Sequence, residues 1–451
     1  MKSTIRKDYF TLPAKVSEME QKGNGKSSHE TPLKKASRFW HMLGPGLTTG
    51  AADDDPSGIA TYSQAGAKFG FQYAWLAIFT FPFMAVVQEM CARIGLVTGR
   101  GLAANIRRHY PKWVLYACAF LLFAANTLNI GANLGAMAKA TQLILPSLNF
   151  GLLIAGFSIL CLALQIFITY QEYAKYLKWL ALILLSYIFS ALFINFDWSA
   201  VAKATFIPSI QLDRDHIFLL CALLGTTISP YLFFWQTSQE VEEEILSGHA
   251  TIHERQTSVT KSLIRNMKID VWSGMLLSNL VMFFIIITCA ATLFSSGITN
   301  IKTAAEAAEA LKPLAGNQAS LLFALGIIGT GLLAVPVLAG SASYAISEAA
   351  GYKQGLYRKL KQAKAFYGII IFSMALGLII NFLGIDPIQT LIWSAVINGI
   401  IAPVILFFIV HISSNKQTMG IWVSGSLSTK AGWLIFALLT VTSAATIISL
   451  L

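Results

Sequence analysis

The sequence Gly50-Ala-Ala-Asp53-Asp54-Asp55-Pro56-Ser57-Gly58 interrupts an apolar segment, residues 43–69, that is long enough to cross a bilayer as a helix. A second apolar segment, residues 217–237, is interrupted by Gly225-Thr226-Thr227-Ile228-Ser229-Pro230-Tyr231. Proline removes a backbone donor and glycine relaxes a helix, so both segments can unwind at mid-membrane depth. We therefore predict two discontinuous transmembrane helices.

The composition indicates one integral membrane unit. Of the 451 residues, 55% are hydrophobic and only 12% are charged, about half the charged fraction of a soluble protein. The apolar residues come in unbroken runs rather than in alternation, which favours helices over a β-barrel. The net charge of +11 is spread between these runs, and we interpret the five cysteines inside them as packing residues. A soluble enzyme, a nucleic-acid binder and a secreted disulfide scaffold are all disfavoured.

The chain divides into a polar tail, residues 1–39, which we expect to be disordered, and a transmembrane domain, residues 40–451. In that domain we predict eleven transmembrane helices: residues 43–69, 71–97, 113–145, 150–170, 176–196, 217–237, 271–294, 321–345, 365–383, 388–410 and 432–451. The even-numbered connections are rich in Lys and Arg, which predicts a cytoplasmic tail and an external C-terminus. With compact loops and no cleavable signal peptide, we expect the cytoplasmic membrane of a bacterium.

The two interruptions also predict the topology. Pro56 and Pro230 stand 174 positions apart, with five predicted spans from one to the other. This spacing is typical of two inverted five-helix repeats, each opening with a discontinuous helix. An odd number of spans per repeat inserts the second repeat upside down, and the eleventh span is an addition.

The aspartate triplet points to a cation site where spans one and six meet. Unwound backbone in a membrane is tolerated around a cavity, where its free carbonyls become ligands. Three aspartates at that depth are costly for a purely structural purpose. Asp55 is the best single ligand candidate, while Asp53 and Asp54 line the path of the ion or sit behind the site. The alternative is that the triplet lies at a water-exposed helix end and pairs with basic residues.

The nearby donors are oxygens. The hydroxyls of Thr226 and Ser229 and the backbone carbonyls accompany the Asp55 carboxylate, and nothing near Pro230 supplies sulfur or imidazole. Such a set suits Mg²⁺, Ca²⁺ or Mn²⁺ better than softer metals. Alternatively, the two hydroxyls bond a neighbouring helix, as hydroxyls commonly do in membranes.

Four segments carry a resemblance to a known family. They are residues 44–58, residues 88–100 (Gln-Glu-Met-Cys-Ala-Arg-Ile-Gly-Leu-Val-Thr-Gly-Arg), residues 341–349 and residues 394–399 (Ser-Ala-Val-Ile-Asn-Gly). The sequence resembles the Nramp family of divalent metal transporters over essentially everything after residue 40. The resemblance implies the inverted-repeat fold, alternating access and a metal site built from spans one and six.

Departures from the family pattern indicate which metal ion the site would select. The family's first-helix motif is Asp-Pro-Gly-Asn, but Ser57 and Gly58 replace its last two residues here. In the sixth helix, Thr226, Ser229 and Tyr231 replace an alanine, a methionine and a histidine. Losing the methionine removes the soft ligand that favours transition metals. Losing the asparagine opens space for a hydrated Mg²⁺, so the sequence resembles the Nramp-related magnesium transporter branch.

Proton coupling is disfavoured by the same comparison. The family's second sixth-helix histidine falls on Gln236, and its third-helix acids fall on Asn129 and Ala132. We interpret Asn126 and Asn133 as helix-packing residues. A proton relay normally needs Asp, Glu or His, so uncoupled transport is expected.

We therefore expect a carrier that imports Mg²⁺, and also Mn²⁺, by alternating access. Its metal site would comprise Asp55, Gly58, Thr226 and Ser229, partly through water, and its partners would be the ion and the lipid bilayer, with no cofactor and no nucleic acid. The sequence carries no signal for oligomeric state. An enzyme is disfavoured because no nucleophile and base occur together. One alternative is a proton-coupled Mn²⁺/Fe²⁺ importer. Another is a sodium-coupled organic-solute carrier, which the aspartate triplet opposes because it would repel a carboxylate.

Three further features have structural interpretations. Glu89 and Arg93 are four residues apart and predict an ion pair within one helix. We interpret Glu240 and residues 242–244 as a solvated helix face, with attraction of cations as the alternative. We expect Glu348 to cap or pair, and the His249/His253 spacing is weak support for a metal site.

Overall fold

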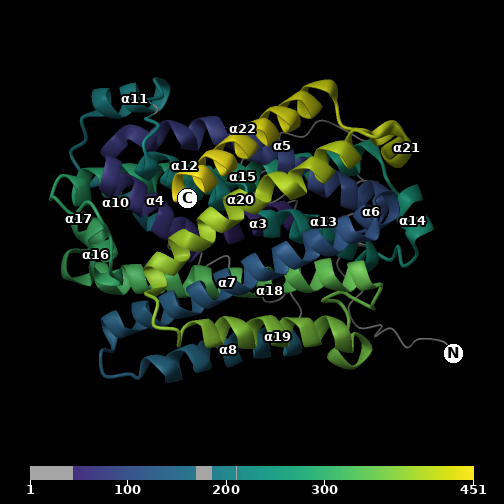
Figure 1. The fold of residues 1–451 in the computed structure, drawn as a ribbon, viewed down its shortest axis with the longest axis horizontal. Helices are drawn as coiled ribbons and strands as arrows, with labels where there is room; N and C mark the ends of the chain where they lie inside the picture. Colours follow the sequence, from purple (N-terminus) through teal and green to yellow (C-terminus); the bar gives the residue numbers. More distant parts are fainter. Residues whose placement is uncertain (1–43, 169–184, 210) are drawn as a thin grey trace, which may run out of the picture.

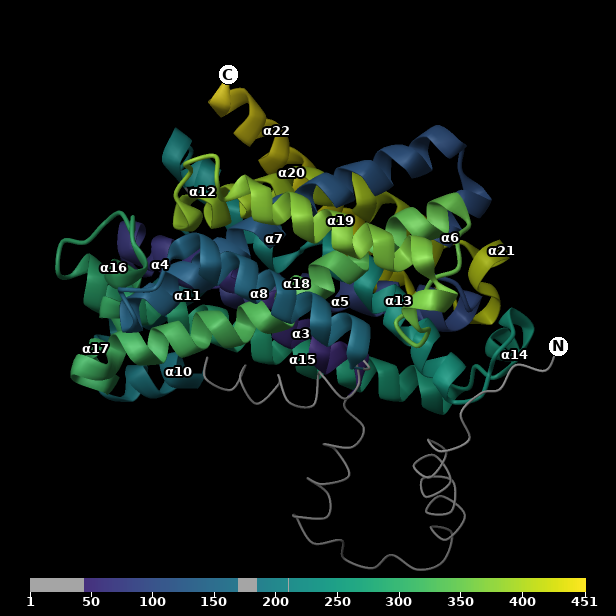
Figure 2. The same cartoon turned by 90° about the horizontal axis from the view of Figure 1, so that it is seen from below.

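The computed structural model describes residues 44–168, 185–209 and 211–451. Their regular elements are all helices, and most of the long ones run along the long axis of the molecule (Figures 1 and 2). This confirms the all-α prediction for the part of the chain that is described. The predicted tail, residues 1–39, and most of the fifth span lie outside it.

The predicted spans match the long helices. They correspond to α3 (Pro45–Asp53) with α4 (Pro56–Phe69), α5 (Ala74–Thr98), α7 (Lys112–Ile144), α8 (Phe150–Phe167), α12 (Arg214–Thr227) with α13 (Pro230–Leu246), α15 (Lys261–Cys289), α18 (Ala319–Ala350), α19 (Lys364–Ile380), α20 (Pro387–Ser413) and α22 (Ser426–Leu450). Only α10 (Leu185–Leu192) represents the fifth span. Eight segments of the described residues are long and apolar enough to cross a membrane, some of them combining consecutive helices.

Both discontinuous helices break with the same backbone geometry. α3 ends at Asp53, and after Asp54 (φ −81°, ψ 48°) the extended Asp55 (φ −68°, ψ 169°) precedes the first residue of α4, a proline. α12 ends in the same way, with Ile228 (φ −115°, ψ 62°) and the extended Ser229 (φ −80°, ψ 128°) before the proline that opens α13. Proline disfavours helix in the residue before it and suits the first helical position. The predicted breaks are confirmed.

The connections gather at two opposite ends of the bundle. In both views α6 (Leu102–His109), α14 (Ile252–Thr257) and α21 (Lys416–Met419) lie at one end (Figures 1 and 2). α11 (Trp198–Phe206) and α16 (Ala304–Ala308) lie at the other. The connections after spans two, six and ten therefore share one end, as their Lys and Arg residues predict, and we call it the basic end.

Peripheral helices present apolar side chains outward. Leu152 and Phe167 of α8 are 75% and 83% exposed, and Ile448 of α22 is 72% exposed. Such surfaces are unfavourable in water and suit lipid. Inside the bundle, all five cysteines are free and buried, which confirms that they serve packing.

The broken helices are held by close backbone contacts. A Cβ atom on Gly50 of α3 would lie 2.3 Å from the carbonyl oxygen of Gly274 on α15, and one on Gly225 of α12 would lie 2.2 Å from that of Ala395 on α20. Glycine is required at both positions, because any larger residue would separate the helices. Small residues commonly permit such packing in membranes.

A buried ion pair stabilises the contact between α5 and α15, the helix against which α3 packs. Arg93 donates to the Glu89 carboxylate at 2.6 Å, as the spacing predicts, and the Lys268 ammonium lies 3.0 Å from the same oxygen. The Trp272 indole donates to the other oxygen at 3.1 Å. The pair therefore joins α5 to α15.

Candidate metal site

Asp55 lies at the centre of the first break and is satisfied by neutral donors. Its Oδ1 accepts from the Gly58 backbone N–H at 2.8 Å and the Ser57 hydroxyl at 2.5 Å, so it caps α4. Its Oδ2 accepts from the side-chain amides of Asn129 and Asn133 on α7, both at 3.2 Å. Interpreting Asn133 as a packing residue was therefore wrong, because it contacts the candidate ligand. Asn126, in contrast, donates to the Leu338 carbonyl of α18 at 2.9 Å, as a packing residue would.

The second break lies against the first. A Cβ atom on Gly58 would be 3.4 Å from the Thr226 hydroxyl oxygen, so these two predicted site residues face each other. Ser229 donates to the carbonyls of Gly225 and Thr226 at 2.9 and 2.6 Å. Across the breaks, the Tyr231 hydroxyl donates to the Ala52 carbonyl of α3 at 3.0 Å. Gly58 thus contacts both Asp55 and Thr226, and Ser229 contacts Thr226, so the four predicted residues lie together. The Ser229 hydroxyl donates its proton to carbonyls of α12, the helix that precedes it.

Asp53 and Asp54 point away from Asp55. Both approach the Ser278 hydroxyl of α15, Asp53 Oδ2 at 2.7 Å and Asp54 Oδ1 at 3.2 Å. They are 0% and 2% exposed, so neither carboxylate is in contact with solvent. The sequence analysis missed Ser278, although a Ser-Asn pair inside the apolar span was a signal that could have found it.

The three carboxylates have no basic partner among the described residues. The salt bridges of that part of the chain lie elsewhere, at Lys68, Arg93, His216, Lys268 and Lys312. The alternative of a water-exposed triplet paired with basic residues is therefore wrong, because Asp55 is also only 1% exposed. A buried charge without a partner is costly, so this arrangement favours a cation.

Sulfur comes closer to the second break than the sequence suggested. The Sδ atom of Met282 on α15 lies 3.8 Å from the Thr227 hydroxyl. The expectation that nothing near Pro230 supplies sulfur was therefore wrong, because α15, a helix distant in sequence, brings this methionine to the break. Among the described residues, no group of three or more His, Cys, Asp or Glu side chains is placed to hold a metal, so a site here depends on neutral oxygens.

The helix α3 is fixed at its beginning by Asp270 of α15. The Asp270 carboxylate accepts from the backbone N–H groups of Gly44, Gly46 and Leu47 at 2.8, 2.6 and 3.1 Å. This is a capping interaction between separate helices. Sequence reasoning missed it because the two helices are more than 220 positions apart.

A series of side-chain hydrogen bonds connects α3 to residues along α13. Thr49 donates to the Gln236 side-chain oxygen at 2.5 Å, and Gln236 donates to Glu240 at 2.8 Å. Glu240, Glu242 and Glu244 are only 5%, 6% and 5% exposed. Interpreting this run as a solvated helix face was therefore wrong for these three residues, because neighbouring helices cover them.

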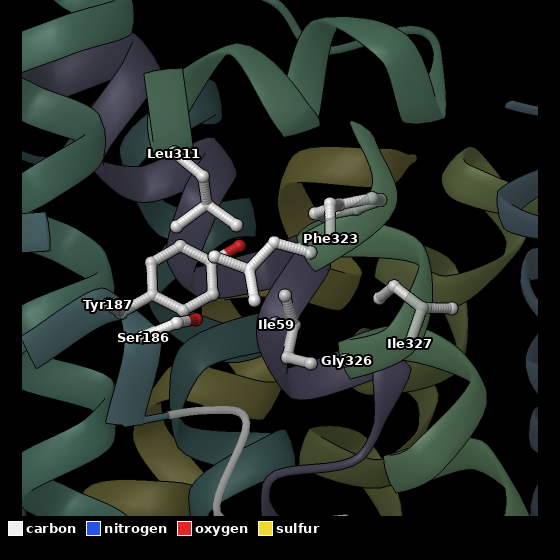
Figure 3. Close-up of a pocket in the computed structure, with 8 residues that line it drawn as sticks. Ile59, Ser186, Tyr187, Leu311, Phe323, Gly326 and Ile327 are labelled. Atoms are coloured by element: carbon white, nitrogen blue, oxygen red, sulfur yellow. The ribbon is translucent and has the colours of Figure 1, made fainter. Parts of the chain in front are cut away.

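The side of α4 that follows Gly58 borders a small cavity. A cavity of about 10 Å³ lies beside Ile59 and Tyr187. Its other walls are mainly apolar, with Leu311, Phe323 and Ile327 around it (Figure 3). This volume is about that of one water molecule, so the cavity is no aqueous route.

Comparison with known proteins identifies the family of this architecture. The family model described as "Natural resistance-associated macrophage protein-like" (Nramp) matches residues 46–449. The chain belongs to the Nramp family. The match includes both breaks and all four predicted site residues, and it confirms the resemblance drawn from the sequence motifs.

Relatives within the Nramp family match nearly the whole chain. The "Divalent metal cation transporter MntH" of Yersinia pestis (strain Pestoides F) is 27% identical over 449 residues, covering 95% of this chain and 99% of the relative. That of Klebsiella pneumoniae (strain 342) is 26% identical over 410 residues, covering 88% and 91%.

Solved structures show the same fold. The Eremococcus coleocola manganese transporter superposes with a TM-score of 0.70 at 17% identity, covering 94% of this chain and 90% of that one. The inward-facing conformation of Mhp1 matches with a TM-score of 0.53 at 13% identity, covering 90% and 89%. The chain therefore has the Nramp transporter fold, in which two discontinuous helices meet at the centre.

Proposed function

We propose that this Nramp protein imports Mg²⁺, and accepts Mn²⁺, by alternating access without proton coupling. The ion binds at Asp55, Gly58, Thr226 and Ser229, partly through water. The basic end and the N-terminal tail face the cytoplasm, and the chain resides in the bacterial inner membrane. Transport of a divalent cation agrees with the names of the related MntH proteins.

One observation carries this proposal. The Asp55 carboxylate is fully buried beside the break of α3 and α4, and the break of α12 and α13 packs against the same point through Gly58 and Thr226. Its partners are neutral amide, hydroxyl and backbone donors. A cation entering between the breaks would supply the missing positive charge, and helix-end carbonyls would supply further oxygens.

The proposed preference for Mg²⁺ rests on the donor types and on space. Ser229 and Thr226 offer hydroxyl oxygens, and the glycine at position 58 leaves room where a side chain would crowd Thr226. Mg²⁺ dehydrates reluctantly and keeps several waters, so it needs this room. Because Met282 lies near Thr227, a contribution of its sulfur to Mn²⁺ binding is the main competing explanation.

The absence of proton coupling rests on α7 and α13. Asn129 and Asn133, which contact Asp55, do not titrate, and Gln236 bridges Thr49 and Glu240 with an amide. A second candidate, a proton-coupled Mn²⁺ carrier, is favoured by the buried carboxylates of Asp53 and Asp54 at Ser278. These are groups of the kind that carry protons in membranes.

Uptake into proteoliposomes tests the two candidates directly. Mg²⁺ and Mn²⁺ entry is measured together with internal pH, for the wild type and for Asp55→Ala. The proposal expects Mg²⁺ entry without acidification, and loss of entry in the variant. Mn²⁺ entry accompanied by protons, without Mg²⁺ entry, would replace it by the second candidate. Sodium-dependent uptake of an organic solute would reject both.

A further inference from the structure

A second cavity opens at the basic end, away from the metal site. Its volume is about 700 Å³, within the usual range for small-molecule sites. It lies between α6, the second half of α13, α14 and the end of α18 with the loop that follows. α6, α13 and α14 lie together at this end in both views (Figures 1 and 2).

The lining of this cavity is strongly cationic. It includes six basic side chains and two carboxylates, those of Glu242 and Glu348, which leaves a net charge of +4. The basic side chains are those of Arg100, Arg107, Arg108, Arg255, Lys353 and Arg358. In the described part of the chain, none of the six forms a salt bridge. Like charges collected around one cavity favour an anionic occupant.

The two carboxylates are engaged by other donors. Glu348 accepts from the Ala104 N–H of α6 at 2.9 Å and from the Gln354 amide at 2.8 Å, which confirms its predicted capping role. A Cβ atom on Gly101 would lie only 1.8 Å from this carboxylate, so a larger residue there would displace the Glu348 side chain. Glu242 accepts from the Leu356 N–H at 2.6 Å and from a tyrosine hydroxyl. Neither carboxylate therefore neutralises the arginines by direct pairing.

Hydrogen-bond donors in this cavity remain available. The Ser238 side chain is only 3% exposed, lines the cavity, and its hydroxyl has no hydrogen-bond partner among the described residues. The Nε of Arg100 is likewise buried and unpaired in that part of the chain. Arg107 and Arg358 each donate to a single backbone carbonyl, at 3.4 and 3.0 Å. A guanidinium has five N–H donors, so Arg107 retains several, whereas Arg358 also lies over the Tyr357 ring, 4.8 Å from its centroid.

Arg255 adds a buried positive charge on the α14 side. It donates to the carbonyls of Gly99, His249 and Ala250 at 3.0 to 3.1 Å. Burial lowers the pKa of its guanidinium, Glu244 opposes that shift, and the like charge of Arg100 adds to it. The repulsion between the two arginines would be relieved by an anion between them.

We propose that this cavity binds a phosphate-bearing anion. Several guanidinium groups together with a buried hydroxyl match the oxygens of a phosphate, which they recognise by charge-assisted hydrogen bonds. The phosphate comes either from the headgroup of an anionic phospholipid or from a soluble phosphate compound. α13 begins at the second break and carries Ser238 and Glu242, so the bound anion contacts a helix of the candidate metal site.

Binding to the full-length purified protein tests this inference. Inorganic phosphate is titrated calorimetrically in detergent at constant ionic strength. Retention of phosphatidylglycerol is measured by native mass spectrometry after extraction from nanodiscs that mix it with phosphatidylcholine. The variants are Arg107→Gln with Arg358→Gln, and separately Ser238→Ala. The matched control is Lys416→Gln with Lys430→Gln, two cations that do not line the cavity.

Binding of at least one probe is expected to weaken about tenfold or more in the double arginine variant, and severalfold in Ser238→Ala, with the control unchanged. Loss confined to phosphatidylglycerol identifies a lipid headgroup, and loss of inorganic phosphate identifies a soluble ligand. If the wild type binds neither probe, or if both cavity variants bind like the control, the inference is overturned. Ser238→Ala keeps every charge, so it remains informative if the arginine variant fails to fold.

Discussion

Replacing Asp55 by asparagine separates the electrostatic role of this residue from its structural role. Asparagine caps a helix about as well as aspartate, so the bonds from Gly58 and Ser57 to Oδ1 are retained. The new amide group would face the amide of Asn133. The Asn133 side-chain oxygen has no partner among the described residues, so a flip of this amide restores a hydrogen bond.

The expected effects on stability and on binding differ widely. The bond from Asn129 to Oδ2 alone lacks a substitute, so the free energy of unfolding should change by about 1–2 kcal/mol. Two unit charges 4 Å apart interact by about 4 kcal/mol at an effective dielectric constant of 20, and a divalent ion doubles this. If retained water halves the doubled value, the loss is about 4 kcal/mol, or roughly a thousandfold in ion affinity.

Thermal unfolding in detergent and Mg²⁺ binding by calorimetry measure the two effects on the same sample. The matched control is Asp386→Asn. Asp386 also caps a helix directly before a proline, and its carboxylate accepts from the Ile388 N–H at 2.8 Å, but it lies on a surface loop. Binding should be lost in Asp55→Asn and unchanged in the control. Mg²⁺ binding near the wild-type level in Asp55→Asn would refute the electrostatic reasoning.

Three further substitutions test the surroundings of the site. Gly58→Asn should reduce Mg²⁺ uptake at least tenfold and Mn²⁺ uptake less, because the new side chain takes the space beside Thr226 that hydration water needs; equal loss of both ions in proteoliposomes would contradict this. Met282→Leu should leave the Mg²⁺/Mn²⁺ preference within about twofold of the wild type, since we assign the sulfur no ligand role; a selective loss of Mn²⁺ binding would show that it is a ligand. Asp270→Asn should lower the free energy of unfolding by about 1–3 kcal/mol, because it weakens three hydrogen bonds to the start of α3. An unchanged melting temperature would count against the role of Asp270 in fixing α3.

The sequence predicted those features that depend on local chemistry. Hydropathy located the long helices, and the prolines at positions 56 and 230 located both breaks within a residue or two. The sequence also predicted the Glu89–Arg93 ion pair, because two residues four positions apart in a helix lie on the same face. The basic connections predicted which loops share an end of the bundle, and the pictures show them together (Figures 1 and 2).

Only the tertiary structure decided how side chains from distant helices combine. Asp53, Asp54 and Asp55 are consecutive in sequence, yet the first two turn to Ser278 and the third to α7, because the chain leaves the helix between them. Asn133, Met282 and the buried glutamates of α13 were misjudged for the same reason. Their environments are set by helices tens to hundreds of positions away, and helix period and composition carry no information about such contacts. Local sequence thus determined where this chain crosses the membrane and where it breaks, whereas packing between distant helices determined which polar groups meet at each break.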